Sequence, residues 1–367
     1  MSARLVVSVG CPSGIGPEVS VVAAAARRAA RVVLVGDLGS LAAAARTRGV
    51  DPARLVRVRG PDVEVQRGQL AVWQPTPSLP ARDRKPGAPT AATGAAELAW
   101  IDAACDEVRS GRGDALVTGP VSKEVIVRSG APGSEGFAGH TEHLQRRLGA
   151  QEVVMAFWSR RLVTSLATTH LPLARVARAI TPSAVERSVF WLAILLARLS
   201  TGVPRVVVAA LNPHAGEAGL LGAEERTRII PGIERARRRL RGAGVEVDVE
   251  AAPVAAESAF RLASEGRWDG VVAMYHDQAT IAMKLLGFGD AVNVSLGLPI
   301  VRTSVDHGTG YDRAGTGTAD AKGMRAAMDL AVKLASRRGR DAAHVERVLP
   351  EVENRRPVLK RNGPTVR

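Results

Sequence analysis

Residues 271–320 read VVAMYHDQATIAMKLLGFGDAVNVSLGLPIVRTSVDHGTGYDRAGTGTAD, and this stretch carries the clearest fold signal in the chain. It begins with a short apolar run that ends abruptly at Tyr275, His276, Asp277 and Gln278. In parallel sheets, polar groups with a function gather at the carboxyl ends of buried strands. The stretch therefore predicts an α/β protein in which a buried strand delivers His276 to one edge of the sheet.

Three polar residues follow at nine-residue intervals, namely Lys284, Asn293 and Arg302, and a Gly-rich passage closes the stretch at residues 306–317. Lysine and arginine in one neighbourhood suit a phosphate or a carboxylate. The alternative is a buried structural histidine at His276 and three solvated polar residues on the surface.

The composition agrees with an α/β fold. The chain has 367 residues, of which 46% are hydrophobic and only 3% are aromatic. Its core must therefore consist of Ala, Val, Leu and Ile, and Ala-rich helical segments alternate with Val-rich strand segments. This length is enough for one large or two medium domains.

The chain is strongly basic, with a formal net charge of +14. Such a charge suits nucleic acid or an anionic small molecule. Nucleic-acid binders usually interleave aromatic and basic residues, whereas this chain has 5 Phe and 2 Tyr and scatters its arginines along helices. We therefore predict a mostly solvated basic surface, no nucleic-acid partner and an anionic substrate.

Two cysteines, Cys11 and Cys105, provide neither a disulfide framework nor a thiolate metal site. A reducing cytoplasm is the simplest location for such a chain. No secretory signal is visible, and no apolar run of about 20 residues predicts a membrane span. Residues 190–199 are instead expected to form a buried helix.

The first 37 residues resemble a dinucleotide-binding unit. A strand at 5–9, a glycine-containing turn at 10–18 and a second strand at 32–35 lead to Asp37, but Val19 stands where the third glycine belongs. Two interpretations remain: a cradle for a dinucleotide, or a different strand–turn–helix unit.

Two other junctions could hold an anion. The strand at 115–117 ends in a segment that contains Thr118, Ser122 and Lys123. Their hydroxyl and ammonium groups could bind an anion at the next helix, or could simply cap that helix. A second helix, at 140–148, opens with His140.

The seven histidines include three, His170, His214 and His276, that each stand just past a predicted strand. The strand ends meet at one edge of a parallel sheet, so residues 44 and 62 positions apart could converge. Three imidazoles with an open position suit a catalytic divalent metal, zinc first. Position alone also allows ordinary histidines, and His143 and His344 are predicted to be structural.

Eight motifs occur in order between about residues 5 and 335: GIGPEV at Gly14, TGPVSK at Thr118, GHTEHL at Gly139, TTHLPL at Thr168, LNPHAGE at Leu211, AMYHDQ at Ala273, NVSLGLPIVRTSVDHGT at Asn293 and AGTGTAD at Ala314. Together they resemble the 4-hydroxythreonine-4-phosphate dehydrogenase family of vitamin B6 synthesis.

The resemblance implies a fold related to isocitrate and isopropylmalate dehydrogenases, with two α/β domains, a cleft between them and a homodimer that shares its active sites. We expect residues 1–130 together with 305–367 to form the first domain. Residues 131–304 would form the second, with most metal and dimer contacts. The apparent dinucleotide fingerprint is then a decoy as a Rossmann cradle. The resemblance instead implies that NAD or NADP lies along the turn at Gly14, Ile15 and Gly16 and the loop with His307, Gly308 and Asp312.

Carried over residue by residue, the family's metal ligands are His170, His214 and His276, one of them from the partner subunit. The implied substrate contacts are His140, Thr141, Lys284, Asn293 and Arg302. The proton acceptor stays open between Lys284, Asp277 and a metal-bound water.

The implied reaction is the NAD(P)-dependent oxidation of 4-phosphooxy-L-threonine at C3 to 2-amino-3-oxo-4-phosphooxybutanoate. Decarboxylation to 3-amino-2-oxopropyl phosphate follows, with one zinc, magnesium or cobalt ion per site. A related dehydrogenase of D-threonate or D-erythronate 4-phosphate is the alternative, and a non-catalytic phosphate- or nucleotide-binding protein is a rival from another class. The chain departs from the family at Cys11 and Glu257, where Asp is usual, and at Ser13, where Ala is common. These departures bear on substrate preference more than on reaction type.

Overall fold

The computed structural model describes residues 2–27, 30–287 and 289–345, with side chains described as far as residue 336. One sheet of twelve strands runs through the described residues in the order β3-β4-β2-β1-β5-β12-β11-β6-β7-β10-β8-β9. Its strands are β1 (Arg4–Ser8), β2 (Arg31–Val35), β3 (Leu55–Val58), β4 (Leu70–Trp73), β5 (Ala115–Thr118), β6 (Val154–Trp158), β7 (Val163–Leu166), β8 (Arg205–Val208), β9 (Asp248–Val249), β10 (Gly270–Ala273), β11 (Val292–Leu296) and β12 (Arg302–Val305).

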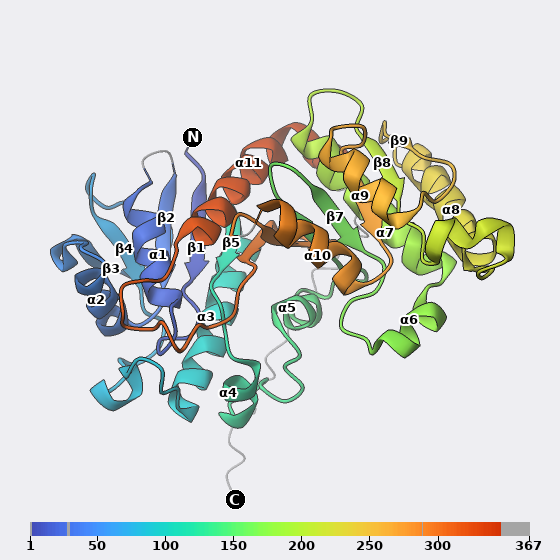
Figure 1. The fold of residues 1–367 in the computed structure, drawn as a ribbon. Coiled ribbons are helices and arrows are strands. Elements are labelled where there is room, and N and C mark those ends of the chain that lie inside the picture. Colours follow the sequence, from blue (N-terminus) through green and yellow to red (C-terminus); the bar gives the residue numbers. More distant parts are fainter. Residues whose placement is uncertain (1, 28–29, 288, 346–367) are drawn as a thin grey trace, which may run out of the picture.

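Helices cover the sheet and divide the molecule into two lobes, with α11 crossing between them (Figure 1). The α-helices are α1 (Gly16–Ala25), α2 (Leu38–Thr47), α3 (Ala91–Arg109), α4 (Lys123–Arg128), α5 (His140–Leu148), α6 (Leu173–Ala179), α7 (Pro182–Leu199), α8 (Ile230–Gly242), α9 (Ala256–Ser264), α10 (His276–Gly287) and α11 (Lys322–Val345). Short helical turns occupy Pro52–Arg54, Ala81–Arg84, Pro213–Gly219 and Glu225–Ile229. The predicted α/β class is confirmed.

Most neighbouring strands are parallel, as their apolar sequences predict. β1 and β10 are buried along almost their whole length, which is typical of strands covered by helices on both faces. The exception is the centre of the sheet, where β11 pairs antiparallel with both β6 and β12, and β6 pairs antiparallel with β7. This antiparallel insertion joins the parallel strands of the two lobes into one sheet.

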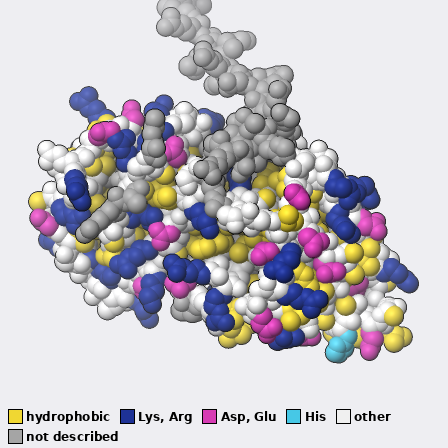
Figure 2. All heavy atoms as spheres, turned by 90° about the horizontal axis from the view of Figure 1, so that it is seen from above, with side chains coloured by type: hydrophobic (Ala, Val, Ile, Leu, Met, Phe, Trp, Pro, Cys, Tyr) yellow, Lys and Arg dark blue, Asp and Glu magenta, His cyan; other side chains and the backbone are white. Residues whose placement is uncertain are grey.

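The apolar segment at 190–199 lies in α7, and Phe190 and Leu192 there are fully buried, so the predicted buried helix is confirmed. Within the described residues no single helix has the length and apolar character of a membrane span, although the bent pair α6 and α7 meets both criteria when taken together. On the face shown in Figure 2, Lys and Arg side chains are interspersed with Asp and Glu.

Candidate functional site

Three adjacent strands carry the predicted histidines. β10 lies between β7 and β8 and is parallel to both, so the segments after these strands leave the sheet at the same edge. His276 begins α10, His170 precedes α6, and His214 lies in the turn Pro213–Gly219. The predicted convergence of these strand ends is therefore present in the sheet.

His170 and His276 lie side by side, with 5.4 Å between their ring centroids. Asp277 Oδ1 is 2.7 Å from His276 Nδ1, and a proton donated from Nδ1 to this carboxylate leaves Nε2 free to bind a metal. Burial, followed by the charges of Lys123 and His276, holds the pKa of His170 below its usual value. Both rings thus have the character of metal ligands.

His214 lies apart from this pair. Its side chain is exposed, and the backbone from His214 to Ala218 has φ values of 50°, 55°, 78°, 44° and 57°, all in the left-handed region. Among the described residues, no group of three His, Cys, Asp or Glu side chains is close enough to hold a metal ion. One chain therefore brings two of the predicted ligands together, and the triad itself stays a prediction.

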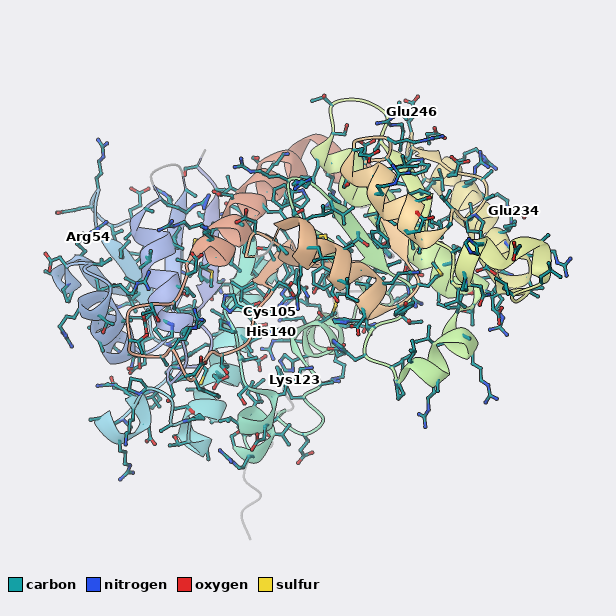
Figure 3. The ribbon with its side chains drawn as sticks, in the orientation of Figure 1. Arg54, Cys105, Lys123, His140, Glu234 and Glu246 are labelled. Atoms are coloured by element: carbon teal, nitrogen blue, oxygen red, sulfur yellow. The ribbon has the colours of Figure 1, made fainter. Side chains whose placement is uncertain are left out.

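A cavity of about 210 Å³ lies beside the histidine pair. It collects six of the eight residues predicted to bind metal or substrate, while Lys284 and His214 are not in its lining. The six are His140, Thr141, His170, His276, Asn293 and Arg302. His140 and Lys123 lie near the middle of the molecule (Figure 3).

Arg302 is the most unusual group in the cavity because its charge is buried without a counter-ion. Its side chain, on β12, donates from Nη2 to Thr118 Oγ1 at 2.7 Å and from Nη1 to Ser295 Oγ at 2.9 Å and Asn293 Oδ1 at 3.3 Å. All three partners are neutral, and Nε has no hydrogen-bond partner within the described residues. Burial lowers the pKa of Arg302 to about 9, and Glu142 opposes this change only in part. A buried cation in this state is prepared to bind an anion.

His140 contributes a second unsatisfied polar group. Its Nε2 is buried and lacks a hydrogen-bond partner in the described part of the chain. Burial, then the charges of Arg302, His143 and Lys123, hold the pKa of His140 well below its usual value, so the ring is neutral. The next residue, Thr141, hydrogen-bonds through Oγ1 to Ser295 Oγ at 3.0 Å. Ser295 Oγ is also the atom that accepts from Arg302 Nη1.

Three charged residues of the lining are absent from the predicted set of metal and substrate contacts. Lys123 begins α4, Glu142 lies in the first turn of α5, and Asp306 follows β12. The TGPVSK motif had indicated Lys123 as an anion-binding candidate; the other two gave no signal. Burial raises the pKa of Asp306, and the charges of Lys284, His276 and His307 oppose this change. The charge of Lys284 thus influences a residue of the cavity, although Lys284 is not in its lining.

The structural prediction for His143 agrees with its surroundings. Its Nε2 is 2.6 Å from Asp102 Oδ1, and its ring packs against Phe137 with 5.3 Å between centroids. His344 lies outside the residues whose side chains are described.

The loops predicted to hold the nicotinamide cofactor touch each other. Ile15 donates its backbone N–H to the carbonyl of Thr309 at 2.9 Å, and Gly315 donates to Glu18 Oε1 at 2.7 Å. A Cβ at Gly14 would stand 2.7 Å from the same Thr309 carbonyl, so this contact requires glycine. His307 also lines the cavity, which puts the second loop next to the substrate residues. The glycines here let the two loops pack closely against each other. Binding of a dinucleotide along these loops stays a prediction.

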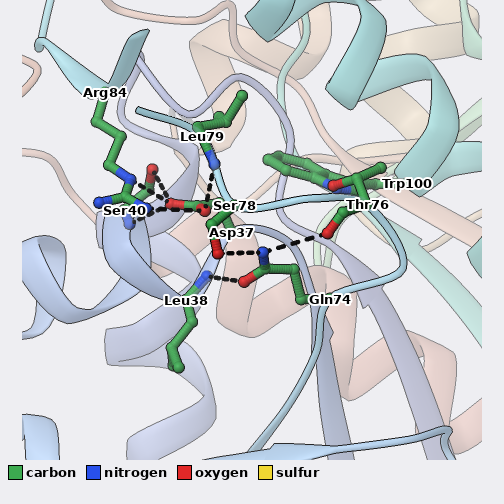
Figure 4. A network of polar contacts seen from close by, with 9 residues as sticks. All are labelled: Asp37, Leu38, Ser40, Gln74, Thr76, Ser78, Leu79, Arg84 and Trp100. Carbon is green, nitrogen blue, oxygen red and sulfur yellow. Dashed lines mark hydrogen bonds and ion pairs between the residues drawn. The ribbon is translucent and has the colours of Figure 1, made fainter. Parts of the chain in front are cut away.

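The hydrogen bonds of Asp37 argue against a ribose contact at this position (Figure 4). Asp37 is fully buried and accepts from the backbone N–H groups of Ser40 at 2.8 Å and Leu79 at 3.1 Å, while Arg84 pairs with it at 2.8 Å. A carboxylate with these partners has no oxygen left for a ribose hydroxyl. Asp37 is the N-cap of α2, and the location of the cofactor itself stays a prediction.

One protein family and several of its members match most of this chain. The family described as "Pyridoxal phosphate biosynthetic protein PdxA" matches residues 28–331. A 4-hydroxythreonine-4-phosphate dehydrogenase of Geobacter metallireducens is 40% identical over 92% of this chain and 96% of its own. Another, from Aromatoleum aromaticum, is 42% identical over 91% of this chain and 97% of its own.

Solved structures agree. A 4-hydroxythreonine-4-phosphate dehydrogenase of Klebsiella pneumoniae has a TM-score of 0.76 and 32% identity, covering 91% of this chain and 100% of its own. A terephthalate 1,2-cis-dihydrodiol dehydrogenase of Burkholderia xenovorans has a TM-score of 0.62 and 30% identity, over 90% and 97% of the two chains. The family match, the identities and the shared fold cover nearly all of the described residues. The chain belongs to the family of pyridoxal phosphate biosynthetic PdxA proteins.

Proposed function

We propose that the protein is a 4-hydroxythreonine-4-phosphate dehydrogenase, which oxidises C3 of 4-phosphooxy-L-threonine with NAD or NADP. The observation that carries this proposal is the buried guanidinium of Arg302, without a counter-ion, in one cavity with His170 and His276. The substrate is a dianionic phosphate on a hydroxy amino acid. The cavity thus has a cation for its charged end and imidazoles near its reacting end.

The anionic part of the substrate binds at the Arg302 end. Among the described residues that line the cavity, Arg302 Nε and His140 Nε2 are buried and lack hydrogen-bond partners, so an anion bound between these two side chains would satisfy both. Lys123 adds a second positive charge at the same cavity. Exclusion of water at this end strengthens each of these contacts.

His170 and His276 would hold a divalent metal, with His214 of a second chain as the third ligand. When bound, such a metal supplies Lewis acidity that stabilises the developing C3 alkoxide. Asp277, 2.7 Å from His276 Nδ1, keeps that ring in the tautomer that leaves Nε2 free. Asp277 is therefore proposed to orient a ligand. The group that takes the C3 hydroxyl proton stays open between Lys284, which does not line the cavity, and a metal-bound water. The hydride goes to the nicotinamide, whose chemistry belongs to the cofactor.

A homodimer would complete this site. Large apolar side chains lie exposed on the segments that carry the predicted ligands: Leu173 follows His170 and is 72% exposed, Leu285 on α10 is 82% exposed, and Leu220 follows the turn with His214. Exposed apolar residues of this size suit a surface that another chain covers. We propose that the second lobe, residues 131–304, forms this interface and that the first domain consists of 1–130 and 305–367. A cytoplasmic location accords with the family's biosynthetic role.

The substrate is tested with a panel of phosphorylated acids, NAD or NADP, and zinc, magnesium or cobalt in turn. We expect kcat/KM for 4-phosphooxy-L-threonine to exceed that for D-threonate or D-erythronate 4-phosphate by about 100-fold. Absorbance of the reduced cofactor measures turnover. The reverse ranking would identify a sugar-acid dehydrogenase, and no cofactor reduction with any substrate would support the non-catalytic rival.

Asp37→Asn provides a test of the cofactor location. The free energy of unfolding of the variant should be about 2 kcal/mol lower than that of wild type. The amide has one acceptor oxygen, whereas the carboxylate served two backbone N–H groups and Arg84. The KM for NAD should stay unchanged. A large rise in this KM, with stability unaltered, would return the cofactor to the first strand–turn–helix unit.

A further inference from the structure

One buried carboxyl group, that of Glu97 on α3, lies beneath the loops that frame the cavity. Its side chain is fully buried. Oε2 accepts the backbone N–H of Ser122 at 3.1 Å, whereas Oε1 has no hydrogen-bond partner among the described residues by distance and angle. The thiol of Cys11 interacts with the carboxyl group. Sulfur is a weak hydrogen-bonding group, so this carboxyl is buried with few strong partners.

The contacts around Glu97 join three loops. Cys11 Sγ lies 3.5 Å from Tyr311 Oη, in the loop that also carries His307. The backbone N–H of Cys11 donates to the carbonyl of Pro120 at 2.9 Å. Ser122 Oγ caps α4 by accepting from the N–H of Val125 at 3.3 Å, and Lys123, the residue that follows Ser122, lines the cavity.

The first loop carries no carboxyl group at Cys11, and the carboxyl group that interacts with this thiol comes from helix α3 instead. We propose that Glu97 is a positioning residue that supplies, from α3, the carboxyl group that the first loop lacks at Cys11. It fixes Ser122 and Tyr311, and through them Lys123 and the cofactor-side loop. The kinetic part of its test rests on the proposed function; the stability part does not.

The charge state of Glu97 follows from its surroundings. Burial raises its pKa to about 8, against weaker opposing effects of Cys11 and Ser122, and no cation contributes. The titratable groups that face it are the Cys11 thiol and the Tyr311 hydroxyl, and burial raises the pKa of both. At neutral pH all three are uncharged. Glutamine is therefore a faithful replacement for Glu97, and leucine keeps the volume but none of the hydrogen bonds.

Thermal unfolding against pH tests the buried carboxyl directly. The unfolded chain releases the Glu97 proton near pH 4.5, whereas the folded chain keeps it to about pH 8, so wild-type stability falls across this window. Glu97→Gln has no proton to lose. Its Tm should exceed that of wild type by an amount that grows from pH 4.5 to 8, reaches about 5 °C and then levels off. A constant difference over this range would overturn the proposal, whether or not the protein is an active dehydrogenase.

Relocating the carboxyl group tests the positioning role. Glu97→Leu should raise the KM for NAD and for 4-phosphooxy-L-threonine about 10-fold with kcat within about 3-fold, and should weaken NAD binding in calorimetry equally, because the loops lose a buried hydrogen bond. The double variant Cys11→Asp with Glu97→Leu should restore both the KM values and Tm. Cys11→Asp alone puts two carboxyl groups together and should lower Tm.

The matched control is Glu107→Leu, which removes a second buried glutamate of α3 together with its ion pair to Arg112 and should change Tm but neither KM. Normal KM values in Glu97→Leu, or a double variant no better than Glu97→Leu, would refute the positioning role. If Glu97→Leu does not fold, recovery of folding in the double variant supports the proposal and its failure refutes it.

Discussion

Replacing Arg302 with methionine is expected to lower kcat/KM for the phosphorylated substrate by about 1000-fold while the protein stays folded. This loss corresponds to about 4 kcal/mol of transition-state binding, the value of two hydrogen bonds to a charged group. No carboxylate of the described residues pairs with the guanidinium, so the proposed substrate anion would be its only strong partner, and methionine fills a similar space without charge. Steady-state kinetics with 4-phosphooxy-L-threonine measure the effect.

The same substitution should not weaken the ligand-free fold. Burial lowers the pKa of Arg302 to about 9. The folded protein therefore stabilises the charged guanidinium less than water does, and at neutral pH this cost is fully present. An apolar residue of similar volume removes this cost, so the Tm of Arg302→Met should match or exceed that of wild type. Inorganic phosphate should raise the Tm of wild type but not of the variant.

Arg147→Met is the matched control. Arg147 pairs with Asp102 at 3.0 Å and Asp106 at 2.6 Å, away from the cavity lining, so its loss should lower Tm and leave kcat/KM unchanged. An Arg302→Met enzyme with wild-type kcat/KM, or one that phosphate still stabilises, would show that the anion binds elsewhere.

Alanine at His170, His214 or His276 should abolish both turnover and bound metal in the pure variants. The expected loss in kcat is about 10⁴-fold, which corresponds to about 5.5 kcal/mol of activation free energy. The structure adds a sharper expectation, because His170 and His276 are neighbours in one chain while His214 lies apart. In a dimer with shared sites, a subunit lacking His214 and a subunit lacking His170 together build one intact site.

Unfolding and refolding an equal mixture of these two variants should therefore restore about a quarter of wild-type activity, since half of the dimers are mixed and each has one working site. A mixture of the His170 and His276 variants should stay inactive, because both residues come from the same chain. Metal content per dimer should follow the same pattern. Recovery in the second mixture, or none in the first, would contradict a site divided in this way.

Much of the fold could be predicted from strand patterns. Apolar runs that end in polar residues marked β5, β7, β8 and β10, and the parallel arrangement of the last three confirmed that their histidines leave the sheet at one edge. The antiparallel pairing of β11 with β6 was not predicted, because these two strands lie far apart in sequence and polar residues interrupt β11 and β12, which therefore lack a clear strand pattern.

For the site, too, local motifs predicted some residues, whereas tertiary packing placed the others. Arg302, His140 and Asn293 were predicted through motifs, but the buried state of Arg302 depends on packing that no local pattern encodes. Glu142 and Asp306 are surface-like in sequence and become cavity residues only through the arrangement of α5 and β12. The left-handed backbone at His214 had no signal either, since alanine and glutamate within it ordinarily avoid such angles.

β12 hydrogen-bonds to β5 on one side and to β11 on the other, so the ladder is unbroken where the two lobes meet. Two bodies joined through such a ladder cannot swing on a flexible tether as many clamshell enzymes do. Opening and closing must come from torsion of the strands or from the loops around the entrance. Arg302 lies on β12 in that junction, so we expect its backbone position to change little if the two lobes move.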